Sequence, residues 1–241
     1  AEYAGLIADH YEKARENILA AQMYELAGDR ARELSNPQLA LSHYHKVLAL
    51  ISGEPHQNTW RVLILHQVAA LLWLQARLVE AGDAYTTMRQ MAEIDGDLAA
   101  QASAMTGLSG VMLDQMQYEQ ALIAAEKAEQ AAFLVGDDLQ LTKALLNKSQ
   151  AHHRLDSSDE ALKEVQQALE LSNRLEDSET AVQCLRLLTL IAVDSGQQAY
   201  VTHYVNLLQD LLNHLDAAKI NLSAIGMGYI ALGEINNRLG R

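Results

Sequence analysis

One small residue returns along the chain at an almost fixed interval, and this recurrence restricts the fold more than any other feature. It falls at Ala40, Ala81, Ala121, Ala161 and Val201, with spacings of 41, 40, 40 and 40 residues. Mostly apolar residues follow each of these markers after four and seven positions, which places them on one face of a helix. A recurrence of this length is typical of a protein in which one supersecondary unit is stacked repeatedly.

A second amphipathic stretch precedes each marker. In the second unit, for example, Leu65, Val68 and Leu72 lie sixteen, thirteen and nine residues before Ala81. Twelve residues before each marker stands a small residue that would let two helix backbones approach closely. These residues are Gly28, Ala69, Ser109, Ser149 and Thr189. We therefore expect each unit to be a pair of helices, A and B, whose apolar faces are buried only when the pairs stack.

Short segments rich in Gly, Asp and Ser separate the expected helices. Pro37 suits the first turn of a helix, where its missing N–H is no loss. A glycine such as Gly136 can end a helix in the left-handed conformation, and the next residue, Asp137, can cap the following helix. The sequence thus predicts an all-α fold, a right-handed α–α superhelix in one domain over residues 1–241. Its expected elements are a leading helix at 3–14, repeats at about 17–54, 58–95, 98–135, 138–175 and 178–214, and a partial repeat at about 217–241.

The last helix A has no helix B after it, and the chain starts abruptly in helix, so we expect a piece of a larger protein. Without a partner helix, Leu232, Ile235 and Leu239 should be partly exposed. This surface predicts a homodimer formed through the terminal helices as one mode of association.

The helix pairs resemble the tetratricopeptide repeat, in the longer variety with about forty residues per repeat. The likeness rests on sets such as Ala81, Tyr85 and Met88 in helix B and on the glycine–aspartate turns. At the N-terminus, His10–Tyr11, Ala27–Ala31 and Asn36–Tyr44 also resemble the start of the helical arm in bacterial signal-transducing ATPases and maltose-activator-like regulators. This resemblance implies a cytoplasmic signalling or transcription-regulatory protein.

The resemblance further implies that side chains of the A helices line a concave groove that binds a protein or peptide. Mapping the groove positions onto this chain yields the candidate residues Leu63, His66, Ala70, Trp73, Lys143, Gln150, His153, Arg154 and Arg186. The first four form an apolar and aromatic segment, and the others are mostly basic. Such a surface favours a ligand with an apolar side chain followed by an acidic group.

Charge and composition exclude several functions. The formal net charge of −13 repels nucleic acids and anionic membranes. No apolar run reaches the length of a membrane span. One cysteine, Cys184, cannot form an internal disulfide, which favours a reducing, cytoplasmic location.

No known constellation of catalytic or metal-binding residues is present in the sequence. The histidines lack metal-ligand spacing, and phosphate-binding or nucleophile-elbow motifs are missing. The segment Gly107–Gly110 falls inside an expected helix A, where its small residues favour helix packing over phosphate binding. We therefore expect no cofactor, no metal and no enzyme activity. The sequence indicates a scaffold or sensor module of a bacterial signalling or transcription-regulatory protein. The alternative is a self-association module of a multidomain ATPase or cyclase.

Overall fold

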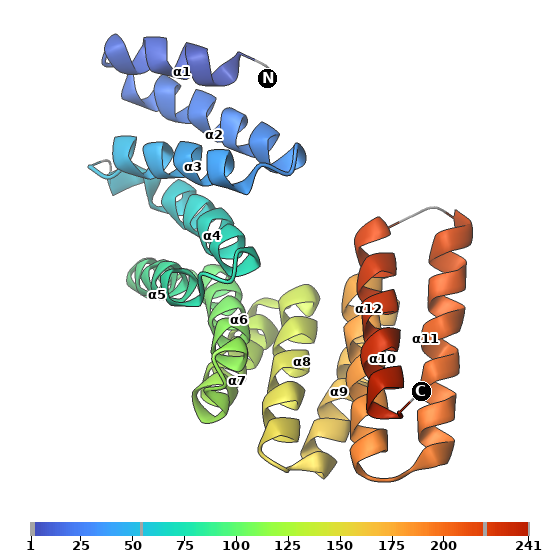
Figure 1. Cartoon of the computed structure of the whole chain (residues 1–241). Helices are drawn as coiled ribbons and strands as arrows, with labels where there is room; N and C mark the ends of the chain where they lie inside the picture. The colour runs from blue at the N-terminus through green and yellow to red at the C-terminus, as the bar shows by residue number, and fades with distance from the viewer. Residues whose placement is uncertain (1–2, 54, 219–220, 241) are drawn as a thin grey trace. The chain divides into compact units, whose positions relative to one another are not determined.

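The computed structural model describes residues 3–53, 55–218 and 221–240. Within these residues it contains twelve α-helices, one short 3₁₀ helix and no strand (Figure 1). The helices are α1 (Ala4–Lys13), α2 (Asn17–Glu33), α3 (Pro37–Leu50), η1 (Pro55–Gln57), α4 (Asn58–Leu74), α5 (Leu78–Asp95), α6 (Leu98–Asp114), α7 (Tyr118–Val135), α8 (Asp138–Arg154), α9 (Ser158–Arg174), α10 (Ser178–Asp194), α11 (Gln198–Ala218) and α12 (Leu222–Arg238). The predicted all-α class is confirmed.

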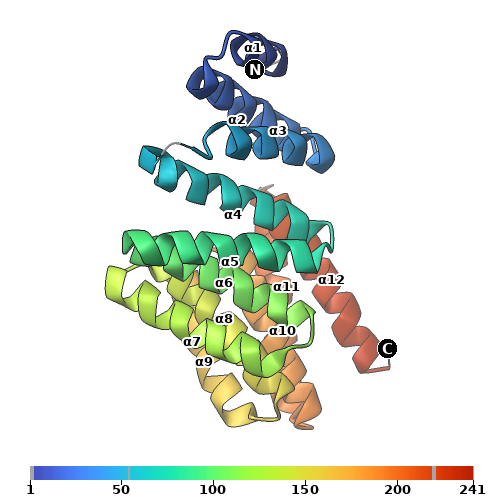
Figure 2. The same cartoon turned by 90° about the vertical axis from the view of Figure 1, so that its left-hand side faces the viewer.

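The helices group into two units, Ala1–Val111 and Met112–Arg241, with the border inside α6. In the first unit α1 packs on α2, α2 on α3, α3 on α4 and α4 on α5. In the second unit α8 lies between α7 and α9, and α10 contacts α8, α9, α11 and α12 (Figures 1 and 2). Each unit has its own core of buried apolar side chains. That both units act as one continuous repeat domain stays a prediction.

The turns repeat as regularly as the helices. Each turn from helix A to helix B holds one residue with positive φ, and only the last of these residues is glycine. They are Ser35, Ala76, Met116, Asp156 and Gly196. Where B leads to the next A, Gly96 and Gly136 adopt the left-handed conformation that ends α5 and α7. Asp137 then accepts a hydrogen bond from the backbone N–H of Gln140, which caps α8 at 3.0 Å.

The marker residues are as inaccessible as the recurrence predicts. Ala81, Ala121 and Ala161 are each 0 % exposed. The small residues on the A helices are also buried, and Ser149 Oγ on α8 donates a hydrogen bond of 2.7 Å to the carbonyl oxygen of Ala161 on α9. The two sets of small residues therefore lie where the helices of a pair meet.

The expectation for the C-terminal helix is wrong for one residue. Ile235 is 1 % exposed, while Leu232 and Leu239 are half-buried. The buried face of α12 comprises Ala224, Gly228, Ala231 and Ile235. A Cβ atom added at Gly228 would lie 2.2 Å from Leu212 Cδ2, so this face sits close against α11. The exposed apolar side chains of α12 are Leu222, Tyr229 and Ile230, on other sides of the helix.

Candidate functional site

The predicted groove residues fall into two groups. Leu63, His66, Ala70 and Trp73 all belong to α4 in the first unit. In the second unit, α8 carries Lys143, Gln150, His153 and Arg154, and α10 carries Arg186.

The α4 group is built around a buried aromatic ring, Tyr85 of α5. Tyr85 is edge-on to His66, with ring centroids 6.1 Å apart, and to Trp73, with centroids 6.5 Å apart. His66, Ala70 and Trp73 are half-buried, and Leu63 is exposed. Three of these four candidates are therefore partly enclosed by helix packing, and Leu63 is the most accessible.

Two glycines of α6 form the seat for these rings. A Cβ atom at Gly107 would lie 2.3 Å from Tyr85 Cε1, and one at Gly110 would lie 2.2 Å from Trp73 Cη2. Any larger residue would therefore displace a ring. The interpretation of Gly107–Gly110 as a helix-packing segment is confirmed.

The second unit contains a cleft of about 250 Å³ that brings four of the predicted residues together. They are Gln150, His153, Arg154 and Arg186, and the other lining residues are Leu113, Asp114, Met116, Tyr118, Leu187 and Leu190. Leu187 and Leu190 of α10 are buried and supply an apolar surface. Lys143 is exposed and does not line this cleft.

Ion pairs from α12 reach residues at the cleft. Arg186 donates a hydrogen bond of 2.8 Å to Glu234, and Arg238 donates one of 2.6 Å to Asp194. In the described part of the chain, Arg154 has no ion-pair partner and its side chain is exposed. The cleft thus offers one unpaired guanidinium and one that is already neutralised.

His153 forms a buried part of the cleft wall. Its side chain is 10 % exposed, and Nε2 lies 3.3 Å from Asp194 Oδ2. Burial lowers the pKa of His153, against the raising effect of the Asp194 carboxylate, so the neutral ring is favoured. We infer that Nε2–H donates to Asp194, which leaves Nδ1 as an acceptor. Among the described residues, no group lies within hydrogen-bond distance of Nδ1.

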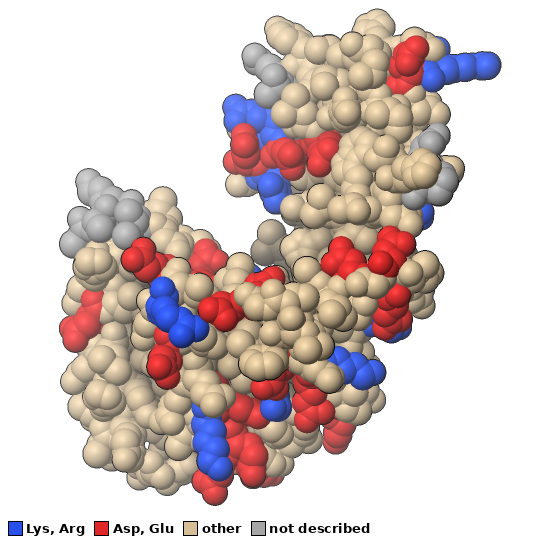
Figure 3. Space-filling model, turned by 180° about the vertical axis from the view of Figure 1, so that it is seen from behind, with Lys and Arg blue, Asp and Glu red and all other residues tan. Residues whose placement is uncertain are grey.

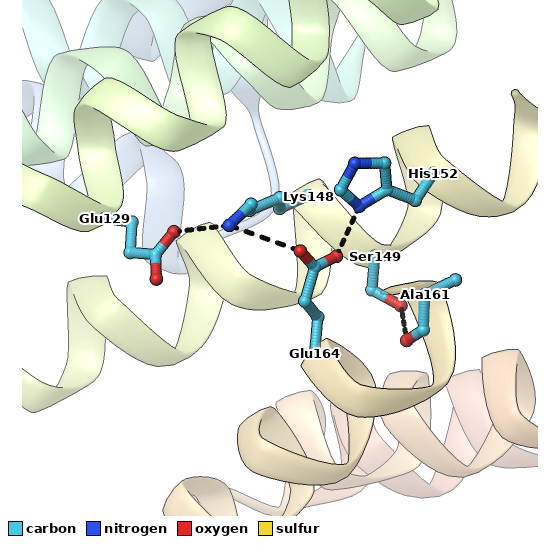
Figure 4. A network of polar contacts seen from close by, with 6 residues as sticks. All are labelled: Glu129, Lys148, Ser149, His152, Ala161 and Glu164. Atoms are coloured by element: carbon cyan, nitrogen blue, oxygen red, sulfur yellow. Dashed lines mark hydrogen bonds and ion pairs between the residues drawn. The ribbon is translucent and has the colours of Figure 1, made fainter. Parts of the chain in front are cut away.

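A polar network that sequence reasoning missed joins α7, α8 and α9 (Figure 4). Lys148 Nζ lies 2.9 Å from Glu129 Oε2 and 3.2 Å from Glu164 Oε1, and His152 Nδ1 lies 2.7 Å from Glu164 Oε2. Burial on its own would lower the pKa of Lys148, but the two carboxylates outweigh this effect and raise it. The sequence signal was Glu164, three residues after the marker Ala161 and so on its buried face.

The contacts of this network join its own members (Figure 4). Lys148 and His152, which interrupt the apolar stripe of α8 in the sequence, are matched by carboxylates from the neighbouring helices. The network therefore has a structural role in joining three helices.

Acidic and basic side chains are interspersed on the face drawn in Figure 3. Within residues 3–53, 55–218 and 221–240, no three His, Cys, Asp or Glu side chains are placed to hold a metal ion. No helix in these ranges has the length and apolar character needed to cross a membrane. Cys184 is buried, and burial raises the pKa of its thiol to about 12, which makes the thiol a poor nucleophile.

Solved structures of similar fold include a phosphatase, a gene regulator and a protein with a sensor domain. Aspartyl phosphate phosphatase F from Bacillus subtilis has 12% identity and a TM-score of 0.68, over 98% of this chain and 69% of that protein. The Rap conjugation gene regulator of the plasmid pLS20, in complex with the Phr* peptide, has 16% identity and a TM-score of 0.66, over 94% and 66%. A STAND protein (signal transduction ATPase with numerous domains) from Pyrococcus horikoshii has a tetratricopeptide repeat sensor. It has 12% identity and a TM-score of 0.70, over 93% of this chain and 34% of that protein.

At these identities the likeness shows the fold alone, and the predicted tetratricopeptide-type helical repeat is confirmed. The similar fold of the STAND protein agrees with the resemblance to the helical arm of signal-transducing ATPases, again as a likeness of fold alone. No protein-family model matches the chain, and no curated protein sequence matches it.

Proposed function

We propose that this chain is a non-catalytic regulatory module that binds a peptide or protein segment in the cleft of the second unit. The observation that carries this proposal is the convergence of Gln150, His153, Arg154 and Arg186 beside an apolar surface. The pLS20 regulator, a protein of similar fold, was solved with a peptide bound. We further propose that the module serves a cytoplasmic signalling or transcription-regulatory protein, as the fold of the STAND sensor supports.

The cleft favours a ligand that combines an apolar side chain with a carboxylate. Leu187 and Leu190 would contact the apolar side chain, because burying it beside them removes apolar surface from water. Arg154 would pair with the carboxylate first, since its guanidinium has no ion-pair partner among the described residues. Arg186 could join only by exchanging Glu234 for the ligand. The net charge of −13 opposes this at long range, but screening over a Debye length of about 8 Å weakens distant charges.

Fluorescence anisotropy with a labelled peptide pair tests this proposal. The peptides are Ac-Leu-Leu-Asp-Leu-Asp-NH₂ and the same sequence with lysine in place of aspartate. We expect the acidic peptide to bind more tightly, and Arg154→Glu to weaken its binding about five- to tenfold. An exposed ion pair contributes up to about 1 kcal/mol, and the introduced carboxylate also repels the ligand.

The matched control is Lys143→Glu, which makes the same charge change on the same helix outside the cleft. It should weaken binding less than Arg154→Glu, because only the general charge of the surface changes. Equal effects of the two variants would show that binding depends on net charge and not on the cleft. Equal affinity for the two peptides would contradict the proposed ligand chemistry.

Self-association is a second candidate function, and the exposed apolar residues of α12 favour it. Leu222, Tyr229 and Ile230 project from the described part of this helix. If they form a homodimer contact, sedimentation velocity should show a concentration-dependent dimer that Ile230→Lys abolishes. A wild-type chain that sediments as a monomer at every concentration would remove this candidate.

A further inference from the structure

A second recess opens on another side of α10 from the cleft. Its volume is about 370 Å³, within the range of about 300–1,000 Å³ that is usual for ligand pockets. Residues of α9 and α11 form its walls, and the buried side chains Leu188, Ile191 and Ala192 of α10 form its floor. None of its lining residues lines the cleft. It is therefore a separate site with an apolar base.

A pair of stacked tyrosines forms one wall of this recess. The rings of Tyr200 and Tyr204 on α11 are 6.2 Å apart between centroids and inclined by 21°. Tyr204 is buried, while Tyr200 remains 54 % exposed. Stacking on a buried neighbour orients the Tyr200 ring, so it offers an aromatic surface at the mouth of an apolar recess. Aromatic rings of this kind are enriched where proteins bind partners.

The rim of the recess carries one negative charge and several neutral polar groups. Of the described residues that line it, Asp159 is the only charged one. The remaining rim residues, Ser158, Gln166, Ser195 and Gln197, carry neutral groups that can hydrogen-bond to a peptide backbone. The net charge of −13 also attracts cationic partners at long range. A carboxylate beside an aromatic wall thus favours a basic group. The cleft differs, because it is lined by Asp114, Arg154 and Arg186, and Arg186 is paired with Glu234.

We propose that this recess binds an aromatic side chain of a partner peptide that carries a basic residue next to it. The aromatic side chain contacts Leu188 and Ile191 and stacks on Tyr200. The neighbouring basic group pairs with Asp159. This assignment shares no residue with the peptide cleft and does not depend on it.

Titration of the whole chain with short peptides, followed by NMR chemical shifts, tests this assignment. The probe is Ac-Arg-Trp-Leu-NH₂, compared with Ac-Glu-Trp-Leu-NH₂ and Ac-Arg-Ala-Leu-NH₂. We expect the probe to bind most tightly. Tyr200→Ala should weaken it about three- to tenfold, since an aromatic pair contributes about 0.5–1.5 kcal/mol beyond its area. Asp159→Asn should remove the preference for arginine over glutamate.

The matched control is Tyr3→Ala, because Tyr3 is 66 % exposed and lies outside the recess. This variant should leave the affinity for the probe unchanged. The assignment is overturned if the probe shows no saturable binding at millimolar concentration, if both tyrosine variants have the same effect, or if the glutamate peptide binds equally well. Should Tyr200→Ala lower the melting temperature, the loss of charge preference in Asp159→Asn decides the test.

Discussion

The two units solve the same packing problem with different chemistry. In the first unit, tyrosines stand four residues after the markers Ala40 and Ala81, and each covers a glycine: Tyr44 lies against Gly28 and Tyr85 against Gly107. In the second unit the position four residues after Ala161 is Val165, and charged side chains of α7, α8 and α9 meet nearby. At these positions the first unit packs a ring on a glycine, whereas the second brings charged side chains together.

The difference matters because shape and charge fail in different ways. A ring that covers a glycine tolerates no added atom, so specificity comes from steric exclusion. A half-buried ion network costs desolvation energy and contributes only if every partner is present. We therefore expect single substitutions to be severe in both units, but compensating double substitutions to restore stability only in the second.

The largest effect should follow from filling the glycine seat in the first unit. We expect Gly107→Ala to lower the free energy of unfolding by about 3 kcal/mol, as overpacking of a core does. Urea denaturation measures this change. Gly82→Ala is the control, because its Cβ would come no closer than 3.8 Å to Val111 Cγ1. That control should raise stability by up to about 1 kcal/mol through helix propensity. Equal effects at both positions would contradict the close packing of Tyr85 on Gly107.

A smaller effect should follow from breaking the network in the second unit. We expect Glu164→Gln to lower the free energy of unfolding by about 2 kcal/mol, because it removes the charge that contacts both Lys148 and His152. The loss is limited because Glu129 still pairs with Lys148. The double variant Lys148→Met with Glu164→Leu should recover part of this loss, since apolar replacement of a buried pair is often neutral. The recovery is partial because Glu129 and His152 then lose a partner. A double variant less stable than Glu164→Gln would mean that the network contributes net stability.

One hydrogen bond distinguishes Ala69 from Ser149, two residues at equivalent repeat positions in different units. Ala69 in the first unit and Ser149 in the second are both fully buried, but only Ser149 donates a hydrogen bond, to Ala161. Ser149→Ala should lower the free energy of unfolding by about 1 kcal/mol. Thermal unfolding measures this loss, and an unchanged melting temperature would show that the apolar solution is equally good in both units.

The smallest effect is the dependence of stability on pH, to which one partly buried histidine in each unit contributes. Burial lowers the pKa of both His43 and His153 below the ordinary value of 6.5. As pH falls through 6.5, the unfolded chain takes up these protons first, so the free energy of unfolding decreases. His153→Gln and His43→Gln should each flatten this decrease between about pH 7 and pH 5. A slope unchanged in both variants would show that other groups cause it.

The sequence by itself determined the repeat and the positions where its helices end and begin. The small residue represented by Ala121 recurs at a fixed interval because each helix pair meets at one close contact. Turn residues such as Gly136 and Asp137 recur with it because each unit needs one helix end and one helix start. The sequence also placed Gln150, His153 and Arg154 correctly on one helix. Such features depend on local periodicity, which a single segment expresses without its neighbours.

Only the tertiary structure decided which groups meet across helices. It placed Glu164 against Lys148 and Glu234 against Arg186, and it put Ile235 on the buried face of α12. It also opened the recess beside Tyr200. Helical periodicity tells which residues share a face, but the rotation of each helix is set by packing against its neighbours. The partner of a long charged side chain depends on that rotation, because a shift of one position turns a residue by about 100° around the helix axis.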